Sequence, residues 1–504
     1  MMRKTTAAWI RLGVVLSLLV LAAMPATASY EDIENEVQEI VLDNGLKILL
    51  LERHEVPVFS FWTYVNVGGV DETTGLTGLA HMFEHMAFKG NTELGTTNYK
   101  KEKKILDKMD LVYEELRDER WKGDKADPDR LAELEAKFKD LQDEAGELVV
   151  PNAFGRMVEE NGGVGMNAGT SPDATQYFYS MPSNQLELWA LMESDRFVRP
   201  VLREFYKERN VIIEERRMRS ESNPQGRLFE EFLATAFLGH SYGQPTIGHR
   251  SDIEAYSRLD AYEFYEKHYG ARNMVVAVVG DIYYEDLKAV AKKYFGRIEP
   301  GHGEQPIRTI EPEQLGERRM VMKDPAQPFM FIGYHIPDAK HEDSNALQAL
   351  ADILGQGRSS RLSTSLIKDT QQALWAGSFT GFPGERFPNL MALVALPNQG
   401  VDPIELEEAV YAEIDKINDE GITADELAGY KQRARAQFIQ GLEGNTGMAA
   451  QLCWAEMILG DWRKLFTQLE EIDTITVEDV QRVAKEYLIE KHRSVAMIVT
   501  EQDS

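Results

Sequence analysis

The sequence predicts an α+β protein made of two homologous units, in which antiparallel sheets are flanked by helices. The length of 504 residues exceeds what one hydrophobic core normally holds, so at least two domains are expected. Strand-like runs are followed by helical runs in each half of the chain, an order typical of α+β domains. The apolar run 273–279 has a counterpart of similar character and placement at 494–500. We therefore predict a repeated unit of about 200 residues.

The first 28 residues are expected to form an export signal and not part of the fold. Arg3 and Lys4 supply positive charge before an apolar run at 12–23. This run is shorter than the about 20 apolar residues of a membrane-spanning helix. Small residues at 26–28 form a cleavage site, so cleavage is predicted after Ala28. The mature chain is then expected to be periplasmic or secreted, with no membrane span.

Composition excludes several kinds of site. Acidic residues number 83 against 55 Lys plus Arg, which gives a net charge of −28. This surplus argues against binding to nucleic acid or to an anionic membrane, because phosphates would be repelled. The single cysteine, Cys453, excludes an intramolecular disulfide and a multi-thiolate metal centre. A metal site must therefore use histidines and carboxylates.

The N-terminal domain is predicted at 35–298. Apolar runs at 40–42 and 46–50 flank the turn Asp43-Asn44-Gly45 and indicate a β-hairpin, and a strand-like run follows at 58–67. Near the end of the domain, 273–279 has the continuous apolar pattern of a buried strand, and 286–295 that of an amphipathic helix.

A charged segment interrupts this domain. Residues 99–149 carry apolar side chains at helical spacing in two runs, which predicts an antiparallel hairpin of two helices. We place the inserted segment at 99–160. It is interpreted as a solvated spacer in preference to a contact arm for a partner or a gate over a site.

The loop rich in Gly and Pro that follows marks the linker, placed at 299–316. The C-terminal domain is predicted at 317–504. It begins with a strand-like run at 329–335, continues with helices at 345–354 and 423–442, and ends with the strand 494–500.

The most informative motif is His81-Met82-Phe83-Glu84-His85, in a segment expected to be helical. His81 and His85 lie one turn apart on the same helical face, so their imidazoles can bind one divalent ion. Glu84 shares this face with His81, which places its carboxylate beside a metal-activated water. The alternative is a pair of structural histidines. Because the chain has a single cysteine, a zinc site is expected to consist of two histidines and a carboxylate.

A third ligand is expected because catalytic zinc takes three protein groups plus water. The helical segment 208–217 is its candidate source, with Val211 and Ile212 expected to face inward. Periodicity alone leaves four carboxylates as possible third ligands: Glu204, Glu208, Glu214 and Glu215. Glu208 and Glu215 are two turns apart and therefore lie on one helical face. For most of them the alternative role is a surface ion pair with neighbouring arginines.

The order His-x-x-Glu-His is the inverzincin signature. Its context at 78–90, GLAHMFEHMAFKG, resembles the pitrilysin/insulinase family, M16, which includes the mitochondrial processing peptidases. The likeness extends over most of the mature chain. Further matching segments are Asn167-Ala168-Gly169-Thr170, 208–215, 242–248, Gly280-Asp281 and 357–362.

This resemblance implies a zinc metalloendopeptidase with one zinc ion (Zn²⁺) per chain. His81, His85 and Glu215 are implied to be the zinc ligands. Glu84 is implied to be the general base that acts on the metal-activated water, and Glu208 an acidic residue that supports catalysis. The gap from His85 to Glu215 exceeds the family norm, and the inserted hairpin accounts for the excess.

The resemblance also implies how substrate binds. Asn167, Ala168, Gly169 and Thr170 would belong to an edge strand to which an extended peptide adds as a further β-strand. Short or unfolded peptides are therefore the expected substrates.

One departure from the family concerns the second half. Active members use an Arg and, seven residues later, a Tyr to bind substrate, where this chain has Lys368 and Trp375. A homologous partner subunit is therefore expected to supply the Arg/Tyr pair, so that each chain forms half of a clamshell around the peptide. A self-sufficient homodimer that uses Lys368 is the second possibility. A non-catalytic scaffold subunit is the third.

Overall fold

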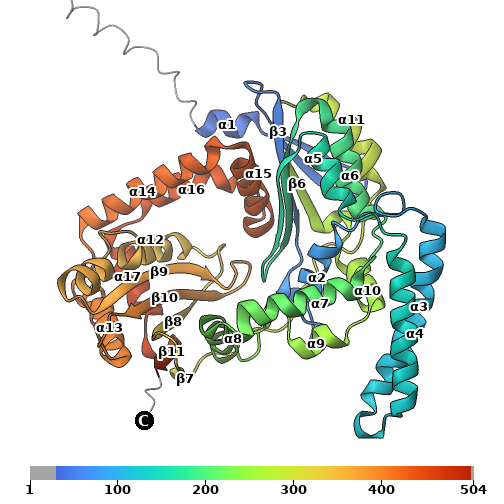
Figure 1. The fold of residues 1–504 in the computed structure, drawn as a ribbon. Coiled ribbons are helices and arrows are strands. Elements are labelled where there is room, and N and C mark those ends of the chain that lie inside the picture. The colour runs from blue at the N-terminus through green and yellow to red at the C-terminus, as the bar shows by residue number, and fades with distance from the viewer. Residues whose placement is uncertain (1–29, 501–504) are drawn as a thin grey trace, which may run out of the picture.

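The computed structural model describes residues 30–500 (Figure 1). The predicted export signal lies outside the described residues and stays a prediction. Between residues 30 and 500, no helix combines the length and apolarity needed to cross a membrane.

The N-terminal half forms a six-stranded sheet in the order β1-β2-β6-β3-β5-β4. Its strands are β1 (Gln38–Val41), β2 (Lys47–Glu52), β3 (Val58–Val65), β4 (Val164–Thr170), β5 (Thr175–Pro182) and β6 (Met274–Gly280). β1 and β2 form the hairpin predicted around Asn44. Every residue of β6 is buried, as its continuous apolar sequence predicts. β4 pairs only with β5, which makes it an edge strand.

The C-terminal half forms a five-stranded sheet in the order β7-β11-β8-β10-β9. Its strands are β7 (Arg318–Asp324), β8 (Phe329–Ile336), β9 (Ala373–Phe382), β10 (Asn389–Pro397) and β11 (Arg493–Thr500). Residues 298–317, between the last turn of the first half and β7, contain no helix or strand.

The two sheets repeat one topology. The order β2-β6-β3-β5-β4 in the first sheet corresponds strand for strand to β7-β11-β8-β10-β9 in the second. The prediction of two related α+β units is therefore confirmed. The sheets are mixed, however, and not purely antiparallel, because β2 pairs with β6, and β7 with β11, in parallel. In each pair three further strands and several helices lie between the two parallel strands, a long connection of the kind that parallel pairing requires and a tight hairpin cannot supply.

Helices from both halves surround the two sheets. The N-terminal half contributes α1 (Tyr30–Glu36), α2 (Leu79–Met86), α3 (Tyr99–Trp121), α4 (Pro128–Gly146), α5 (Ala153–Glu160), α6 (Leu186–Val198), α7 (Phe205–Arg216), α8 (Pro224–Ala236), α9 (Arg250–Ala255), α10 (Arg258–His268) and α11 (Tyr284–Tyr294). The C-terminal half contributes α12 (Ser344–Gly355), α13 (Pro403–Glu420), α14 (Ala424–Glu443), α15 (Asn445–Trp454), α16 (Lys464–Thr474) and α17 (Val477–Tyr487).

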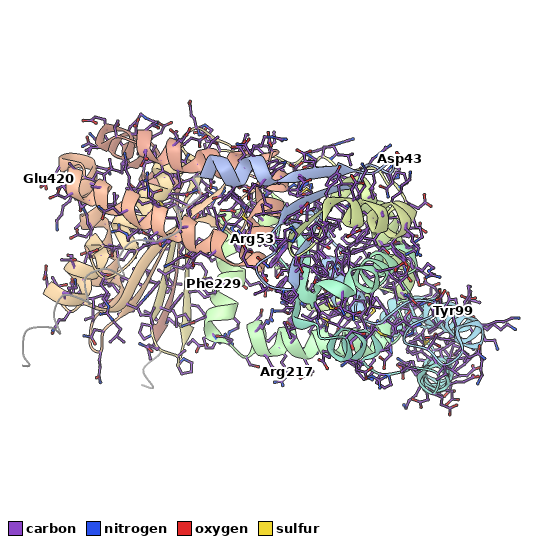
Figure 2. The ribbon with its side chains drawn as sticks, turned by 90° about the horizontal axis from the view of Figure 1, so that it is seen from above. Asp43, Arg53, Tyr99, Arg217, Phe229 and Glu420 are labelled. Carbon is purple, nitrogen blue, oxygen red and sulfur yellow. The ribbon has the colours of Figure 1, made fainter. Side chains whose placement is uncertain are left out.

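One helix of each half packs against the sheet of the other half (Figure 1). α8, from the first half, packs against β7, β8 and β11, where Phe232 contacts Phe331 in an edge-to-face pair at 4.5 Å. α15, from the second half, packs against β3 and β6 and buries Leu452 and Cys453 there. Figure 2 shows Phe229 of α8 between the two parts of the molecule. The two halves are therefore joined through shared cores.

The inserted helical hairpin consists of α3 and α4, which pack together and project from the body of the molecule (Figure 1). It ends at Gly146, before the predicted limit of 160. α5 is a separate helix whose Phe154 and Val158 are buried in the core of the first half. The two helices of the hairpin are present, but the predicted interval 99–160 also included α5, which belongs to the core.

Candidate metal centre

The motif residues lie on the short helix α2. Its apolar side chains face the core, where Phe83 packs against Tyr269 with ring centroids 4.1 Å apart. The helix begins after Gly78, which has φ +88° and lies so close to Ile247 that a Cβ would be 2.6 Å from the carbonyl oxygen of Ile247. Only glycine meets both conditions. The requirement for glycine at position 78 thus sets where α2 starts.

Glu72 caps the start of α2 from outside the helix. Its two carboxylate oxygens accept hydrogen bonds from the backbone N–H groups of Gly78 (2.7 Å) and Ala80 (2.6 Å). Burial raises the pKa of Glu72 to about 8, and these two hydrogen bonds oppose the shift. Sequence patterns did not indicate this contact, because Glu72 stands too far before the helix to match a capping box.

Three possible ligands converge between α2 and α7. Glu215 Oε2 lies 3.6 Å from His81 Nε2 and 3.6 Å from His85 Nε2. One ligand atom from each of the three residues lies within 4.8 Å of the other two. Zinc bonds of 2.0–2.1 Å in a tetrahedral site imply ligand separations of about 3.4 Å. The donor set and its spacing therefore fit one zinc ion.

Glu208 contacts the outer face of the same site. Its Oε2 lies 3.3 Å from His85 Nδ1, the ring nitrogen opposite the one that faces Glu215. A metal-binding histidine commonly donates its other ring N–H to a carboxylate, which fixes the orientation of the ring. Lys89 Nζ forms an ion pair with Glu208 Oε1. Glu208 is thus placed to orient His85.

The charges around the site favour a cation. Burial lowers the pKa of His81 to about 4, and the neighbouring His85 adds to the shift. Burial also acts to lower the pKa of His85, but contacts with Glu208 and Glu215 outweigh it and raise that pKa to about 9. Zinc binding requires neutral imidazoles, so a metal would take the place of the proton on His85 Nε2, the nitrogen that faces Glu215.

Glu84 lies beside the three clustered residues without being one of them. Its Oε2 accepts a 2.7 Å hydrogen bond from Thr170 Oγ1, at the end of the edge strand β4. Burial raises the pKa of Glu84, and the hydrogen bond from Thr170 opposes this shift. Thr170 was predicted from the sequence only as part of a strand that binds the substrate backbone. The hydrogen bond from its side chain to Glu84 was not predicted.

The edge strand β4 has a free side. Its residues are partly or fully exposed, and its register with β5 shifts between Val164 and Asn167. The backbone N–H of Ala168 donates to the Asn167 side chain (2.9 Å) and not to β5. Because alternate N–H groups of a strand point to opposite sides, Ala168 presents its N–H to the open edge.

The structure distinguishes the four carboxylates that periodicity left as possible third ligands. Glu215 alone among them belongs to the three-residue cluster with the histidines. Glu204 binds Lys207 (2.7 Å), and Glu214 is exposed and paired with Arg217 (2.8 Å). The expectation that Val211 faces inward is wrong. Its side chain is 45% exposed whereas Ile212 is fully buried, because Ile212 takes the face of α7 that packs on the core.

Lys368 and Trp375 belong to the other half of the chain. Lys368 lies in the short π-helix Ser363–Asp369 and donates to the carbonyl of Arg358 (2.6 Å). Trp375 lies on the edge strand β9 and is 48% exposed. Within residues 30–500, no hydrogen bond or ion pair joins either residue to His81, His85 or Glu215.

Models of the M16 peptidases match both halves of this chain. The model described as insulinase (peptidase family M16) matches residues 47–110 and 150–250, and the one described as the peptidase M16 inactive domain matches 255–434. Together they match more than half of the chain, which belongs to the M16 family. The unmatched interval between 110 and 150 falls mostly within the α3–α4 hairpin.

Known proteins of this family resemble the chain over nearly its whole length. The zinc protease PqqE of Helicobacter pylori is 28% identical over 482 residues, which cover 94% of this chain and 95% of that protein. The crystal structure of a protease from Helicobacter pylori has a TM-score of 0.75 at 26% identity and covers 92% of this chain and 99% of its own. The half-clamshell fold class is therefore confirmed.

A longer relative shows the fold in a different context. The periplasmic protease PqqL from Escherichia coli has a TM-score of 0.67 at 16% identity, a likeness of fold alone. The match covers 92% of this chain but 47% of PqqL. The present chain thus corresponds in fold to about half of that protein.

Proposed function

We propose that this chain is a zinc-dependent endopeptidase that cleaves short or unfolded peptides. His81, His85 and Glu215 would hold one zinc ion, with Glu84 as general base and Glu208 as the residue that orients His85. The observation that carries the proposal is the convergence of two imidazoles and one carboxylate within 4.8 Å. The membership of the M16 family and the likeness to zinc proteases support it.

The residues of this chain would divide the chemistry between them. Zinc supplies Lewis acidity, which activates water and polarises the peptide carbonyl. Glu84 takes a proton from the attacking water at its carboxylate and passes it to the leaving amine. The hydrogen bond from Thr170 holds Glu84 between the metal ligands and the edge strand. Proton transfer therefore occurs next to the strand that would bind the substrate.

Peptide binding is proposed at β4, through Asn167, Ala168, Gly169 and Thr170. An extended peptide that pairs with the open edge would gain main-chain hydrogen bonds, while side-chain contacts would tune preference. Because Thr170 ends this strand and contacts Glu84, a peptide added along β4 would pass the general base.

Ala168→Pro is expected to lower kcat/KM by about 2- to 12-fold, chiefly through a higher KM. Proline removes the N–H that faces the open edge, and one hydrogen bond contributes about 0.5–1.5 kcal/mol. The pairing of β4 with β5 does not use this donor. Steady-state cleavage of a fluorogenic peptide measures the effect, with Ala168→Val as the matched variant that keeps the N–H. Equal KM values for the two variants would exclude strand addition at this residue.

The active unit is proposed to contain a homologous partner subunit that supplies the Arg/Tyr pair. Lys368 and Trp375 stand where that pair is expected, and tryptophan offers one indole N–H in place of a hydroxyl. The fold match to half of PqqL fits an assembly of two such chains. A homodimer that relies on Lys368 is the alternative. We also propose export, with cleavage after Ala28, so that the protein acts in the periplasm or outside the cell.

Coexpression tests the function and the partner together. The chain purified with a homologous M16 subunit that lacks the zinc motif is expected to cleave unfolded peptides, and a chelator should abolish this activity. The isolated chain should bind zinc but cleave poorly. Full activity of the isolated chain would refute the heterodimer, and a zinc-free pair without chelator-sensitive cleavage would indicate a scaffold.

A further inference from the structure

The inserted hairpin is firmly attached at its base. The backbone N–H of Thr97 donates to the carbonyl of Leu148 (2.8 Å), and that of Val150 to Gly95 (3.0 Å), so the two ends of the insertion are tied together. On α3, Tyr113 packs against Tyr206 of α7 with ring centroids 4.4 Å apart. The hairpin therefore contacts the helix that carries Glu208 and Glu215.

A buried ion pair lies at the centre of this contact. Glu102 of α3 and Arg203, two residues before α7, are 0% and 1% exposed. Arg203 Nε donates to Glu102 Oε1 (2.9 Å), and Nη2 donates to Oε2 (3.2 Å). A charge removed from water in this way requires its partner, because an unpaired buried charge is strongly unfavourable.

Arg203 also binds the turn that follows α2. Nη1 donates to the carbonyls of Lys89 (2.5 Å) and Leu94 (3.0 Å), and Nη2 donates to that of Asn91 (2.7 Å). A guanidinium has five N–H groups, and these contacts together with Glu102 account for five hydrogen bonds. Arg203 thus fixes the end of the helix that carries both histidines against the start of the helix that carries Glu215.

The turn after α2 is also connected to His85, one of the proposed metal ligands. The Lys89 side chain forms an ion pair with Glu208, and Glu208 contacts His85 Nδ1 at 3.3 Å. A continuous set of contacts therefore runs from Glu102 through Arg203, Lys89 and Glu208 to His85.

We propose that the inserted hairpin sets the geometry of the metal centre, with Glu102 and Arg203 as positioning residues that hold α2 and α7 in register for zinc. The inference rests on the proposed function. It replaces the interpretation of the hairpin as a spacer. Removal of an outer partner in direct contact with a metal ligand typically weakens metal binding by about 10- to 100-fold. Glu102 and Arg203 act through Lys89 and Glu208, so the lower end of this range sets the scale of the expected effect.

A second ion pair of the hairpin provides a matched control. Asp110, also on α3, pairs with Arg258 of α10 in a comparably buried setting, with side chains 9% and 6% exposed. This pair anchors the hairpin without contacting the turn after α2. If the hairpin acted only through general stability, loss of either pair would have the same consequence for zinc.

The test uses the full chain as wild type, Glu102→Gln, Arg203→Lys and Asp110→Asn, each titrated with zinc against a chromogenic chelator. Glu102→Gln and Arg203→Lys are expected to bind zinc about 10-fold more weakly, the lower end of the range for a direct outer partner, and to change the visible spectrum of the cobalt-loaded chain. Asp110→Asn should lower the thermal unfolding midpoint while leaving zinc affinity and the cobalt spectrum unchanged. Arg203→Lys keeps the charge beside Glu102 but not the five-donor geometry, so it decides the matter if Glu102→Gln does not fold.

The outcomes separate the two proposals. Wild-type zinc affinity in both Glu102→Gln and Arg203→Lys, or equal weakening in Asp110→Asn, would overturn the positioning role while the wild-type chain still binds zinc. A wild-type chain that binds no zinc would instead contradict the proposed function, and the inference with it.

Discussion

Glu84→Gln is expected to lower peptide cleavage by about 10²- to 10⁴-fold while the zinc content stays at one ion per chain. Glutamine keeps the shape of the side chain and can still accept the hydrogen bond from Thr170 Oγ1. It cannot take a proton from water, and general acid–base catalysis contributes about this factor. Because Glu84 is not one of the three clustered residues, the metal site should be unaffected.

The measurement compares kcat/KM of wild type and variant on one fluorogenic peptide, each in complex with the homologous subunit, with metal content determined on the same samples. Thr170→Val is a useful companion variant, because it removes the hydrogen bond to Glu84 but leaves the carboxylate. Its loss should be smaller than that of Glu84→Gln. Cleavage by Glu84→Gln at more than about a tenth of the wild-type rate would contradict the role of general base.

Glu215→Gln is expected to weaken zinc binding by more than about 100-fold, the upper range for loss of an outer partner, because here a direct ligand loses its charge. Glu215 Oε2 faces both imidazoles at 3.6 Å. The neighbouring Glu214 is the matched control, since it has the same chemistry in the same helix but is exposed and paired with Arg217.

Zinc titration against a chelator distinguishes the two variants. Glu214→Gln should bind zinc with wild-type affinity, and Glu215→Gln should lose the metal together with activity. If the two variants bound zinc equally, the third ligand would have to be sought elsewhere, first at Glu208.

Local sequence patterns predicted the part of the site that lies within one helix. The four-residue spacing of His81 and His85 is enough to place both imidazoles on one face of α2. The buried strand β6 and the hairpin of β1 and β2 were predicted on the same local grounds, and both are confirmed. The parallel pairing of β2 with β6 was missed, because sequence order does not reveal the direction in which distant strands meet.

The choice of Glu215 as the proposed third ligand depends on tertiary contacts that periodicity cannot supply. Glu208 and Glu215 share a helical face, yet one reaches Nδ1 of His85 and the other lies between the two Nε2 atoms. In the same way, nothing in the local sequence around Glu102 indicates its pairing with Arg203, a residue 101 positions later. The positions of such pairs follow from how the helices pack.

The most direct test is a crystal structure of the full chain grown with zinc, with anomalous diffraction recorded on both sides of the zinc absorption edge. A single zinc peak is expected, about 2.0–2.2 Å from His81 Nε2, His85 Nε2 and a carboxylate oxygen of Glu215. A peak at other residues, or no peak between these three side chains, would contradict the assignment of the metal centre.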